Sequence, residues 1–502
     1  MRGKDKKVVK LIDRFVEGLS SAKMNVEEGE RIIRQLQGLA DDAVPRIVDL
    51  LEFPEQEKRR AALVLLRELG DTRAVGPLRR ILRHPDDHSD EEKMGVIHTL
   101  EILGAPIDEA TFRRAISDPD ALMQNSMEQM LATIEDPIHV EAFLEMMGEA
   151  PPEMLALYVQ DMLAPFADRR LLLLLTALLH SDDDDVIITA IDAIERMKEP
   201  ATIPILAERA KYDPSTLVRH TAENAALRLE VRIGAPDEEH TSFWFTASSL
   251  PLNCCLLCTI DGSGGQVLLI AREQPDGELQ MLDLMFNDHE GIKDCFTALV
   301  DEDELDEMTD SFGSSEFVDV SLARARAEAA RAYQVTLEAG RRLPPAFVVW
   351  QGELEGEDAR QIEEFPLPTL KPSQQEELLV ECVELLNLDE FDFWFFNPDE
   401  VEPFVSRYRE LFLDGLAEEG DVEFEALLDE AIESLIDEEY RRLLANRLSR
   451  QAWLLAQLYE EEEVSLWLLV AASALEEGIV VEHPLMRDMM DRSLLNAVGR
   501  YR

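Results

Sequence analysis

The feature that most constrains the fold of this chain is a repeat with a period of 32 residues. Pro45 and Pro77 lie 32 positions apart in similar surroundings. The same spacing returns about 100 residues later, in the pairs Val186 and Val218, Ala190 and Ala222, and Ala193 and Ala225. Self-similarity at such a period is typical of a solenoid, in which each unit is one small motif stacked on the next. We predict about seven helix pairs, which form an α-solenoid over residues 1–234.

One unit, Lys58–Leu82, has the start and stop signals expected of two helices joined by a turn. Gly70 is placed to end the first helix, because glycine adopts the left-handed conformation of a helix C-terminus at little cost. Asp71 or Thr72 can cap the next helix, and Pro77 lies near the start of that helix, where a missing N–H is tolerated. This unit therefore predicts a helix, a tight turn and a second helix.

This unit, with the sequence KRRAALVLLRELGDTRAVGPLRRIL, resembles the HEAT repeat, in the subtype first named from phycobiliprotein lyases. The resemblance returns in Asp184–Leu206 and Asp213–Leu229, whereas over Arg83–Ser181 the repeats follow from the helix-pair rhythm alone. The resemblance implies a stack of helices that binds another protein in its groove. The subtype also leaves open a lyase that acts on a chromophore or another small ligand.

The charge of the chain limits its partners. There are 104 acidic and 49 basic residues, so the formal net charge is −55. Such a surface repels phosphate backbones and anionic lipids, and we expect neither a nucleic acid nor a membrane as partner. The apolar stretches fall short of the roughly 20 residues of a membrane-spanning helix, and the N-terminal segment lacks the apolar core of a signal peptide, so we expect a cytoplasmic protein.

The expected partner is a protein with a basic or amphipathic surface. Acidic loops next to the second helix of a repeat should give the rim of the solenoid groove a negative potential, which speeds encounter with basic partners. The candidate rim residues are Asp86, Asp87, Asp182, Asp183, Asp184 and Asp185.

After Gly234 the pattern changes from helical to strand-like, and we predict a small α+β domain with an antiparallel meander over residues 240–366. The predicted strands are Ser242–Thr246, Leu252–Ile260, Gln266–Ala271, Leu279–Phe286 and Ala346–Gln351. The predicted helices are Ile292–Leu299 and Ser321–Ala339. Because the pattern changes abruptly, we expect few contacts across the boundary and a solenoid that folds separately.

The middle domain contains the one cluster of acidic and imidazole groups that suggests chemistry. The segment Asn287–Gly291 is predicted to link a strand to a helix, a place where sites often form. The candidate residues are Asp288, His289 and Glu290, with Arg331 and Arg341 as positive partners. Asp288 is equally suited to cap the following helix, and the arginines to pair with acidic neighbours. An enzyme with its site here is thus the alternative to a scaffold, and no catalytic residue is assigned because no second acid–base group completes a constellation.

The cysteines do not predict a metal site. Cys255 and Cys258 have the spacing of a metal knuckle, but strand alternation places them on opposite faces, and no second pair follows. Free cysteine is among the most buried residue types. We therefore predict core cysteines and expect neither a metal nor a cofactor.

The remaining residues, 373–502, predict a helical bundle. Ser373–Glu376 has the pattern of a capping box, and an aromatic cluster at Phe391–Glu400 is expected in the bundle core, since monomers seldom expose large apolar patches. The fold class is therefore mainly α, with an N-terminal solenoid, a small α+β domain and a C-terminal bundle. The function that this organisation favours is a non-enzymatic scaffold or adaptor.

Overall fold

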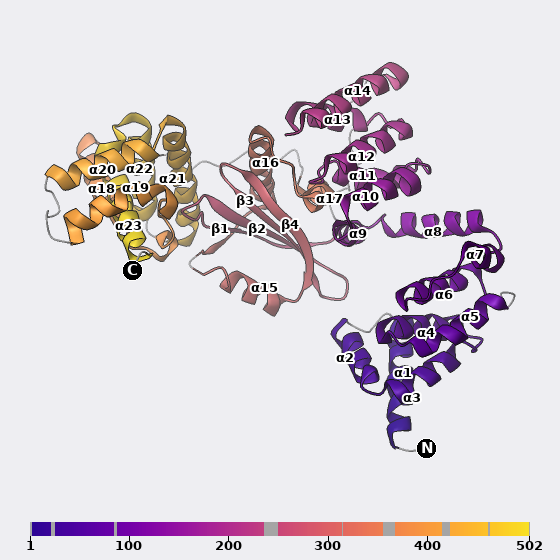
Figure 1. Cartoon of the computed structure of the whole chain (residues 1–502). Coiled ribbons are helices and arrows are strands. Elements are labelled where there is room, and N and C mark those ends of the chain that lie inside the picture. The colour runs from indigo at the N-terminus through magenta and orange to yellow at the C-terminus, as the bar shows by residue number, and fades with distance from the viewer. Residues whose placement is uncertain are drawn as a thin grey trace. The chain divides into compact units, whose positions relative to one another are not determined.

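The computed structural model describes residues 3–21, 26–84, 88–234, 249–313, 315–354, 367–413, 422–459 and 462–500. In these ranges the chain is mainly helical, with one five-stranded antiparallel sheet in its middle part, as predicted (Figure 1). It divides into two compact units, Met1–Ala132 and Thr133–Arg502. None of the described helices is long and apolar enough to cross a membrane.

The first unit consists of helix pairs. Its helices are α1 (Gly3–Ser21), α2 (Val26–Gln37), α3 (Ala40–Leu50), α4 (Gln56–Leu69), α5 (Val75–Arg83), α6 (Asp90–Ile102), α7 (Glu109–Ala115) and most of α8 (Pro119–Thr133). The predicted turn between α4 and α5 is confirmed. Gly70 closes α4 with φ 61°, and the side chain of Asp71 accepts a hydrogen bond of 2.9 Å from the backbone N–H of Arg73.

The second unit begins with further helices of the same kind. They are α9 (Pro137–Gly148), α10 (Pro152–Tyr158), α11 (Leu172–Leu178), α12 (Asp184–Met197), α13 (Thr202–Tyr212) and α14 (Thr216–Ile233). The small residues that defined the repeat, Ala190, Ala193, Ala222 and Ala225, are fully buried. Since α12 packs against α14, these alanines let neighbouring helices approach closely.

The repeat period is also visible in polar contacts between neighbouring units. In the first unit Arg59 on α4 pairs with Glu92 on α6 at 2.5 Å, 33 positions later. In the second unit Arg228 on α14 pairs with Glu195 on α12 at 2.7 Å, again across 33 positions. Both ion pairs thus link helices about one repeat apart, the first near the N-terminal ends of its helices and the second toward their C-terminal ends.

The middle of the second unit is a sheet with the strand order β4-β3-β2-β1-β5. Its strands are β1 (Leu252–Cys258), β2 (Gly265–Glu273), β3 (Leu279–Asn287), β4 (Gly291–Val300) and β5 (Phe317–Asp319). Helix α15 (Glu302–Asp310) packs against one face through Leu305, and α16 (Leu322–Glu338) packs against the other. Cys255 and Cys258 are both buried in β1.

Two elements of this part differ from the prediction. Ile292–Leu299, predicted as a helix, is β4, because Gly291 (φ 79°) makes a tight turn that pairs this segment with β3 in register Phe286 to Ile292. Ala346–Gln351, predicted as a strand, is part of helix α17 (Pro345–Leu354). Its branched and aromatic residues favour a strand, but they are buried by α9, α11 and β4, and such packing overrides strand propensity. The predicted strand Ser242–Thr246 lies outside the described residues.

The C-terminal part of the second unit is a helical bundle, as predicted. Its helices are α18 (Pro372–Glu381), α19 (Pro398–Tyr408), α20 (Val422–Leu435), α21 (Glu438–Leu458), α22 (Glu463–Glu477) and α23 (Pro484–Arg500). Phe391, Trp394 and Phe396 are buried in its core, whereas Phe393 is 66% exposed. The predicted capping box is wrong: α18 begins at Pro372, whose fixed φ suits the first helical position, so that Lys371 takes the cap position instead of Ser373.

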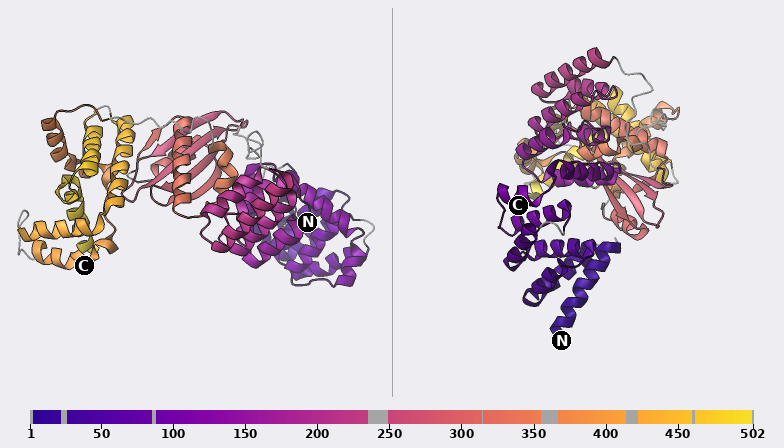
Figure 2. Two further views of the ribbon diagram at one scale, coloured as in Figure 1. Left: turned by 90° about the horizontal axis from the view of Figure 1, so that it is seen from above. Right: turned by 90° about the vertical axis from the view of Figure 1, so that its right-hand side faces the viewer.

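The sheet lies between the HEAT-type helices of this unit and the C-terminal bundle (Figure 2). The expected scarcity of contacts across the boundary after Gly234 is wrong. The main joint is Arg342, whose guanidinium group pairs with Asp184 at 2.6 Å and with Asp213 at 3.1 Å. It also donates to the carbonyl oxygens of Ser181 and Asp182 at 3.0 Å.

A second joint involves Glu141 on α9. Its carboxylate accepts hydrogen bonds from the indole N–H of Trp350 at 2.7 Å and from the backbone N–H of Thr297 at 2.8 Å. Trp350 lies on α17 and Thr297 on β4, so one side chain fixes α9 to both elements. The repeats of this unit are thereby held to the sheet by buried polar contacts.

We predict that Arg342→Gln lowers the stability of the second unit by about 3 kcal/mol, because it leaves two partly or fully buried carboxylates without their cation. All five tryptophans lie in the second unit, so the midpoint of urea denaturation followed by tryptophan fluorescence reports on this unit alone. Arg341→Gln is the control, since the Arg341 side chain is 42% exposed and should contribute less than about 1 kcal/mol. Equal midpoints for the two variants would contradict the role of Arg342.

Candidate functional site

The predicted cluster Asn287–Gly291 is the turn between β3 and β4. Asp288 is buried, and its carboxylate forms a two-pronged ion pair with Arg447 of α21, with Nε to Oδ2 at 2.7 Å and Nη2 to Oδ1 at 2.9 Å. The ring of His289, about half exposed, has Nδ1 3.4 Å from Asp288 Oδ1. Glu290 lies at the surface and pairs with Lys293 at 2.7 Å and with Arg341 at 3.0 Å.

Arg447 ties this turn to a second one. Its guanidinium group also donates to the carbonyl oxygens of Gly262 and Ser263. Gly264 follows with φ 87°, and a Cβ at this position would overlap the Asp288 carboxylate, so only glycine fits. The geometry thus assigns Asp288 to the joint between the sheet and the bundle.

Arg331 belongs to a separate buried cluster around Glu328 of α16. The Glu328 carboxylate pairs with Arg324 at 2.7 Å, with Arg331 at 3.0 Å and with Arg450 of α21 at 3.3 Å. The guanidinium group of Arg324 lies 3.9 Å from the centre of the Trp453 ring. Burial by itself raises the pKa of Glu328, but the three guanidinium groups outweigh it and lower the pKa to about 2.

The structure thus separates the predicted site residues. Asp288 joins Arg447, Arg331 joins Glu328, and Arg341 joins Glu290, so the five candidates do not form one constellation. Among the residues that the structure describes, no group of three or more His, Cys, Asp and Glu side chains is placed to hold a metal ion.

We predict that the Glu328 cluster makes the protein sensitive to acid. The folded-state pKa of Glu328, about 2, lies below its ordinary value of 4.5, so its contribution to stability is present above pH 4.5 and is lost as the pH falls toward 2. The contribution is about 3 kcal/mol by the cost of one pKa unit. In urea titrations at pH 7 and pH 3, Glu328→Gln should be less stable than the native protein at pH 7 and should lose less on acidification. Glu338→Gln, an exposed position on the same helix, should behave like the native protein.

The predicted acidic rim serves partly as internal structure. Asp183 caps α12, accepting hydrogen bonds from the backbone N–H groups of Asp185 at 2.9 Å and Val186 at 3.1 Å. Asp184 is bound by Arg342, and the hydrogen bonds from Ser215 and Arg342 lower the pKa of its carboxyl group. Asp182 and Asp185 are exposed. Asp86 and Asp87 lie outside the described residues.

A methionine-lined groove is the site that the sequence did not predict. It lies between α9 and α10, together with the π-helical turn Val159–Leu163 that continues α10, and has a volume of about 520 Å³. Its lining includes Phe143, Met146, Met147, Met154, Leu157 and Met162. Met146, Met154 and Leu157 are 59%, 61% and 51% exposed, which is unusual for large apolar side chains of adjacent helices.

The segment that forms this groove carries a single sign of charge. Asp161 lines the groove, Glu145, Glu149 and Glu153 are exposed on the same segment, and residues 140–166 contain no lysine or arginine. The signal that could have revealed the groove is local composition, since four of the 17 methionines fall within residues 146–162. Helical periodicity alone does not separate these residues from a core.

The comparison with protein families supports the repeat assignment for this part of the chain. Residues 140–226 match the model of HEAT repeats. The match covers α9 to α13 and part of α14, and it contains the methionine-lined groove. It lies outside Lys58–Leu82, and it is to HEAT repeats in general, so the lyase subtype stays a prediction. No curated protein matches the chain at the threshold applied.

Proposed function

We propose that this protein is a non-enzymatic scaffold that holds a basic amphipathic helix of a partner protein in the methionine-lined groove. HEAT repeats commonly serve as protein-interaction scaffolds, and the groove lies within the matched repeats. The observation that carries the proposal is the combination of exposed apolar side chains with an acidic segment, residues 140–166, that contains no lysine or arginine.

The apolar part suits a helix as ligand. Methionine is unbranched and polarizable, so a groove lined by Met146, Met147, Met154 and Met162 can adapt to the side chains of a bound helix. An amphipathic helix places apolar side chains at positions i, i+3, i+4 and i+7 into such a groove. An aromatic contact stabilises one part of the groove, where the ring centroids of Phe143 and Tyr158 lie 6.4 Å apart.

The charged part selects the partner. With Glu145, Glu149, Glu153 and Asp161 exposed on the segment that forms the groove, lysine and arginine at the edge of a bound helix find carboxylates within reach. Such complementarity raises the rate of association and disfavours acidic competitors.

The groove is supported from behind. Glu141 lies one turn from Glu145 on α9 and fixes this helix to Trp350 and Thr297 through hydrogen bonds of 2.7 and 2.8 Å. Met147 and Leu155, at the base of the groove, are buried. A groove whose base is fixed loses little conformational entropy on binding, which favours affinity.

The test measures binding of a fluorescein-labelled peptide that forms a lysine- and leucine-based amphipathic helix, by fluorescence anisotropy. The double variant Met146→Gln, Met154→Gln should weaken binding by about tenfold for each side chain, since each loses roughly 1.4 kcal/mol of apolar contact. The matched control is Leu217→Gln, Leu227→Gln, at two apolar side chains of α14 that are 58% and 53% exposed.

A second peptide, with every lysine replaced by glutamate, should bind at least tenfold more weakly than the first. Equal binding of the basic peptide by the methionine variant and the leucine control would contradict the groove as the site. Preference for the acidic peptide would contradict the proposed partner.

A further inference from the structure

The first unit carries a face of the opposite charge. Two cavities flank helix α5, one of about 520 Å³ on the side of α3 and one of about 830 Å³ on the side of α7. Residues 72–84, which include the whole of α5, contain four arginines and one histidine and no carboxylate. The chain as a whole has a net charge of −55, so a segment with this excess of basic residues differs from the average composition.

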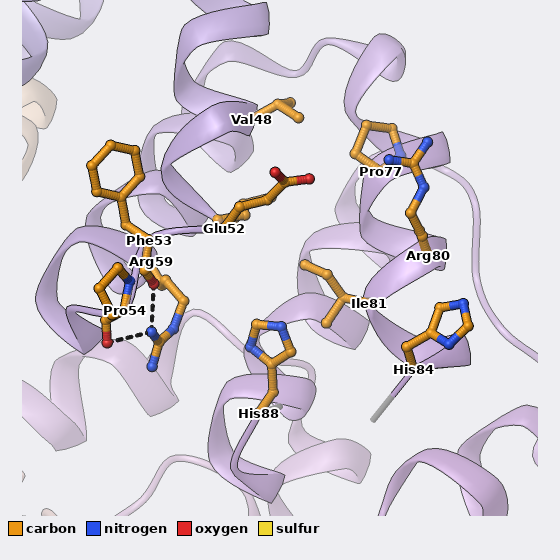
Figure 3. Close-up of a pocket in the computed structure, with 11 residues that line it drawn as sticks. Val48, Glu52, Phe53, Pro54, Arg59, Pro77, Arg80, Ile81, His84 and His88 are labelled. Carbon is orange, nitrogen blue, oxygen red and sulfur yellow. Dashed lines mark hydrogen bonds between the residues drawn. The ribbon is translucent and has the colours of Figure 1, made fainter. Parts of the chain in front are cut away.

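The first cavity is shown in Figure 3. Arg59 lines it and is fully engaged. Its Nε donates to Glu92 at 2.9 Å, and its Nη1 donates to the carbonyl oxygens of Phe53 and Pro54 at 2.6 and 2.7 Å. His84 and His88 lie on the side of the cavity near the end of α5 (Figure 3). Arg59 therefore has a structural role in the wall of the cavity, because its hydrogen-bond donors are already used within the protein.

Other cations around α5 are available. Arg80 and Arg83 are exposed and form no hydrogen bond or ion pair with another residue of the described chain. Arg79, also exposed, makes one long hydrogen bond of 3.4 Å to the carbonyl oxygen of Ala105. Arg80 lines the first cavity, while Arg79 and Arg83 line the second together with Arg114 of α7 and one carboxylate, that of Asp108. We name the surface formed by Arg79, Arg80 and Arg83 with the two cavities the α5 face.

The α5 face is apolar as well as basic. Val48, Phe53, Pro54, Pro77 and Ile81 line the first cavity, together with Arg59, Arg80 and the carboxylate of Glu52. Phe53 is 41% exposed. A ligand for this cavity thus needs carboxylates to meet the arginines and an apolar side chain to fill the space beside Ile81.

An acidic protein segment meets both requirements better than a nucleic acid. Binding to a phosphate backbone depends on cations that follow the strand, whereas here an apolar cavity interrupts the arginines. A carboxylate pairs well with the planar guanidinium group of arginine, which can bind it through two N–H groups.

We infer that the α5 face docks an acidic segment of a partner protein, with an apolar side chain of that segment in the cavity of Figure 3. This docking surface is distinct from the methionine-lined groove in residues, in unit and in charge. A chain with both surfaces can link an acidic partner to a basic one.

The test uses the full chain and a fluorescein-labelled peptide of alternating glutamate and phenylalanine, with binding measured by fluorescence anisotropy at 50 and 500 mM NaCl. The triple variant Arg79→Gln, Arg80→Gln, Arg83→Gln should weaken binding at 50 mM NaCl by tenfold or more and should remove most of its dependence on salt. The control variant Arg34→Gln, Arg407→Gln, Arg442→Gln changes the net charge by the same amount at exposed arginines elsewhere and should bind like the native protein.

The apolar part of the inference has its own test. Ile81→Gln should weaken binding of this peptide about fivefold and should leave unchanged the weaker binding of a peptide in which serine replaces phenylalanine. The inference is overturned if the triple variant and its charge-matched control bind alike, or if a single-stranded oligonucleotide of equal charge binds more tightly than the peptide. Self-association that ultracentrifugation detects in the native chain and not in the triple variant would assign the face to a second copy and would also overturn it.

Discussion

Arg342 joins parts of the second unit that the repeat pattern alone would leave separate. It follows Gly340, whose left-handed backbone (φ 63°) ends α16. It reaches two aspartates at the starts of helices in successive repeats, Asp184 at the first position of α12 and Asp213 shortly before α14. An arginine keeps its proton at such a site, so its pairing with these carboxylates stabilises the unit and its loss leaves two carboxylates without their cation. Because the repeats are fixed to the sheet, the outward side of α9 and α10 is presented on a rigid support.

The solenoid could be predicted because its signals are local. Gly70, Asp71 and Pro77 act within one turn of chain, and the buried alanines repeat at a fixed distance, so neither signal depends on what the stack later contacts. The two wrong elements of the middle domain show the opposite situation. Residues 292–299 form a strand because β3 offers them a partner, and residues 346–351 form a helix because α9 and α11 bury them. In both segments tertiary contacts determine the secondary structure, and these contacts cannot be read from a single sequence.

The candidate site was beyond prediction for a related reason. Asp288 and Arg447 are 159 positions apart, and nothing in either neighbourhood indicates the other. An acidic turn with a histidine therefore suggested chemistry, whereas the carboxylate is buried as half of a structural ion pair. The methionine-lined groove was missed for the opposite reason: residues that form a surface have the sequence pattern of a buried core. Its residues follow helical spacing like those of any core. They form a surface because no element among the described residues covers them, and that depends on the tertiary arrangement of the unit.

The charge of the chain illustrates why a sum over the sequence is a poor guide to a binding face. At physiological ionic strength the Debye length is about 8 Å, so a ligand seated in a cavity responds to the groups within that range and hardly to the net charge of −55. The cavity beside α5 is lined by two arginines and one glutamate, whereas the segment that forms the methionine-lined groove carries carboxylates and no cation. The expectation that nucleic acids and anionic membranes are not partners follows from the average charge. The choice between a basic and an acidic protein partner follows from the charges close to each binding surface. In a stack of similar helix pairs the buried residues maintain the fold, so the exposed residues, and with them the local charge, can vary from one repeat to the next.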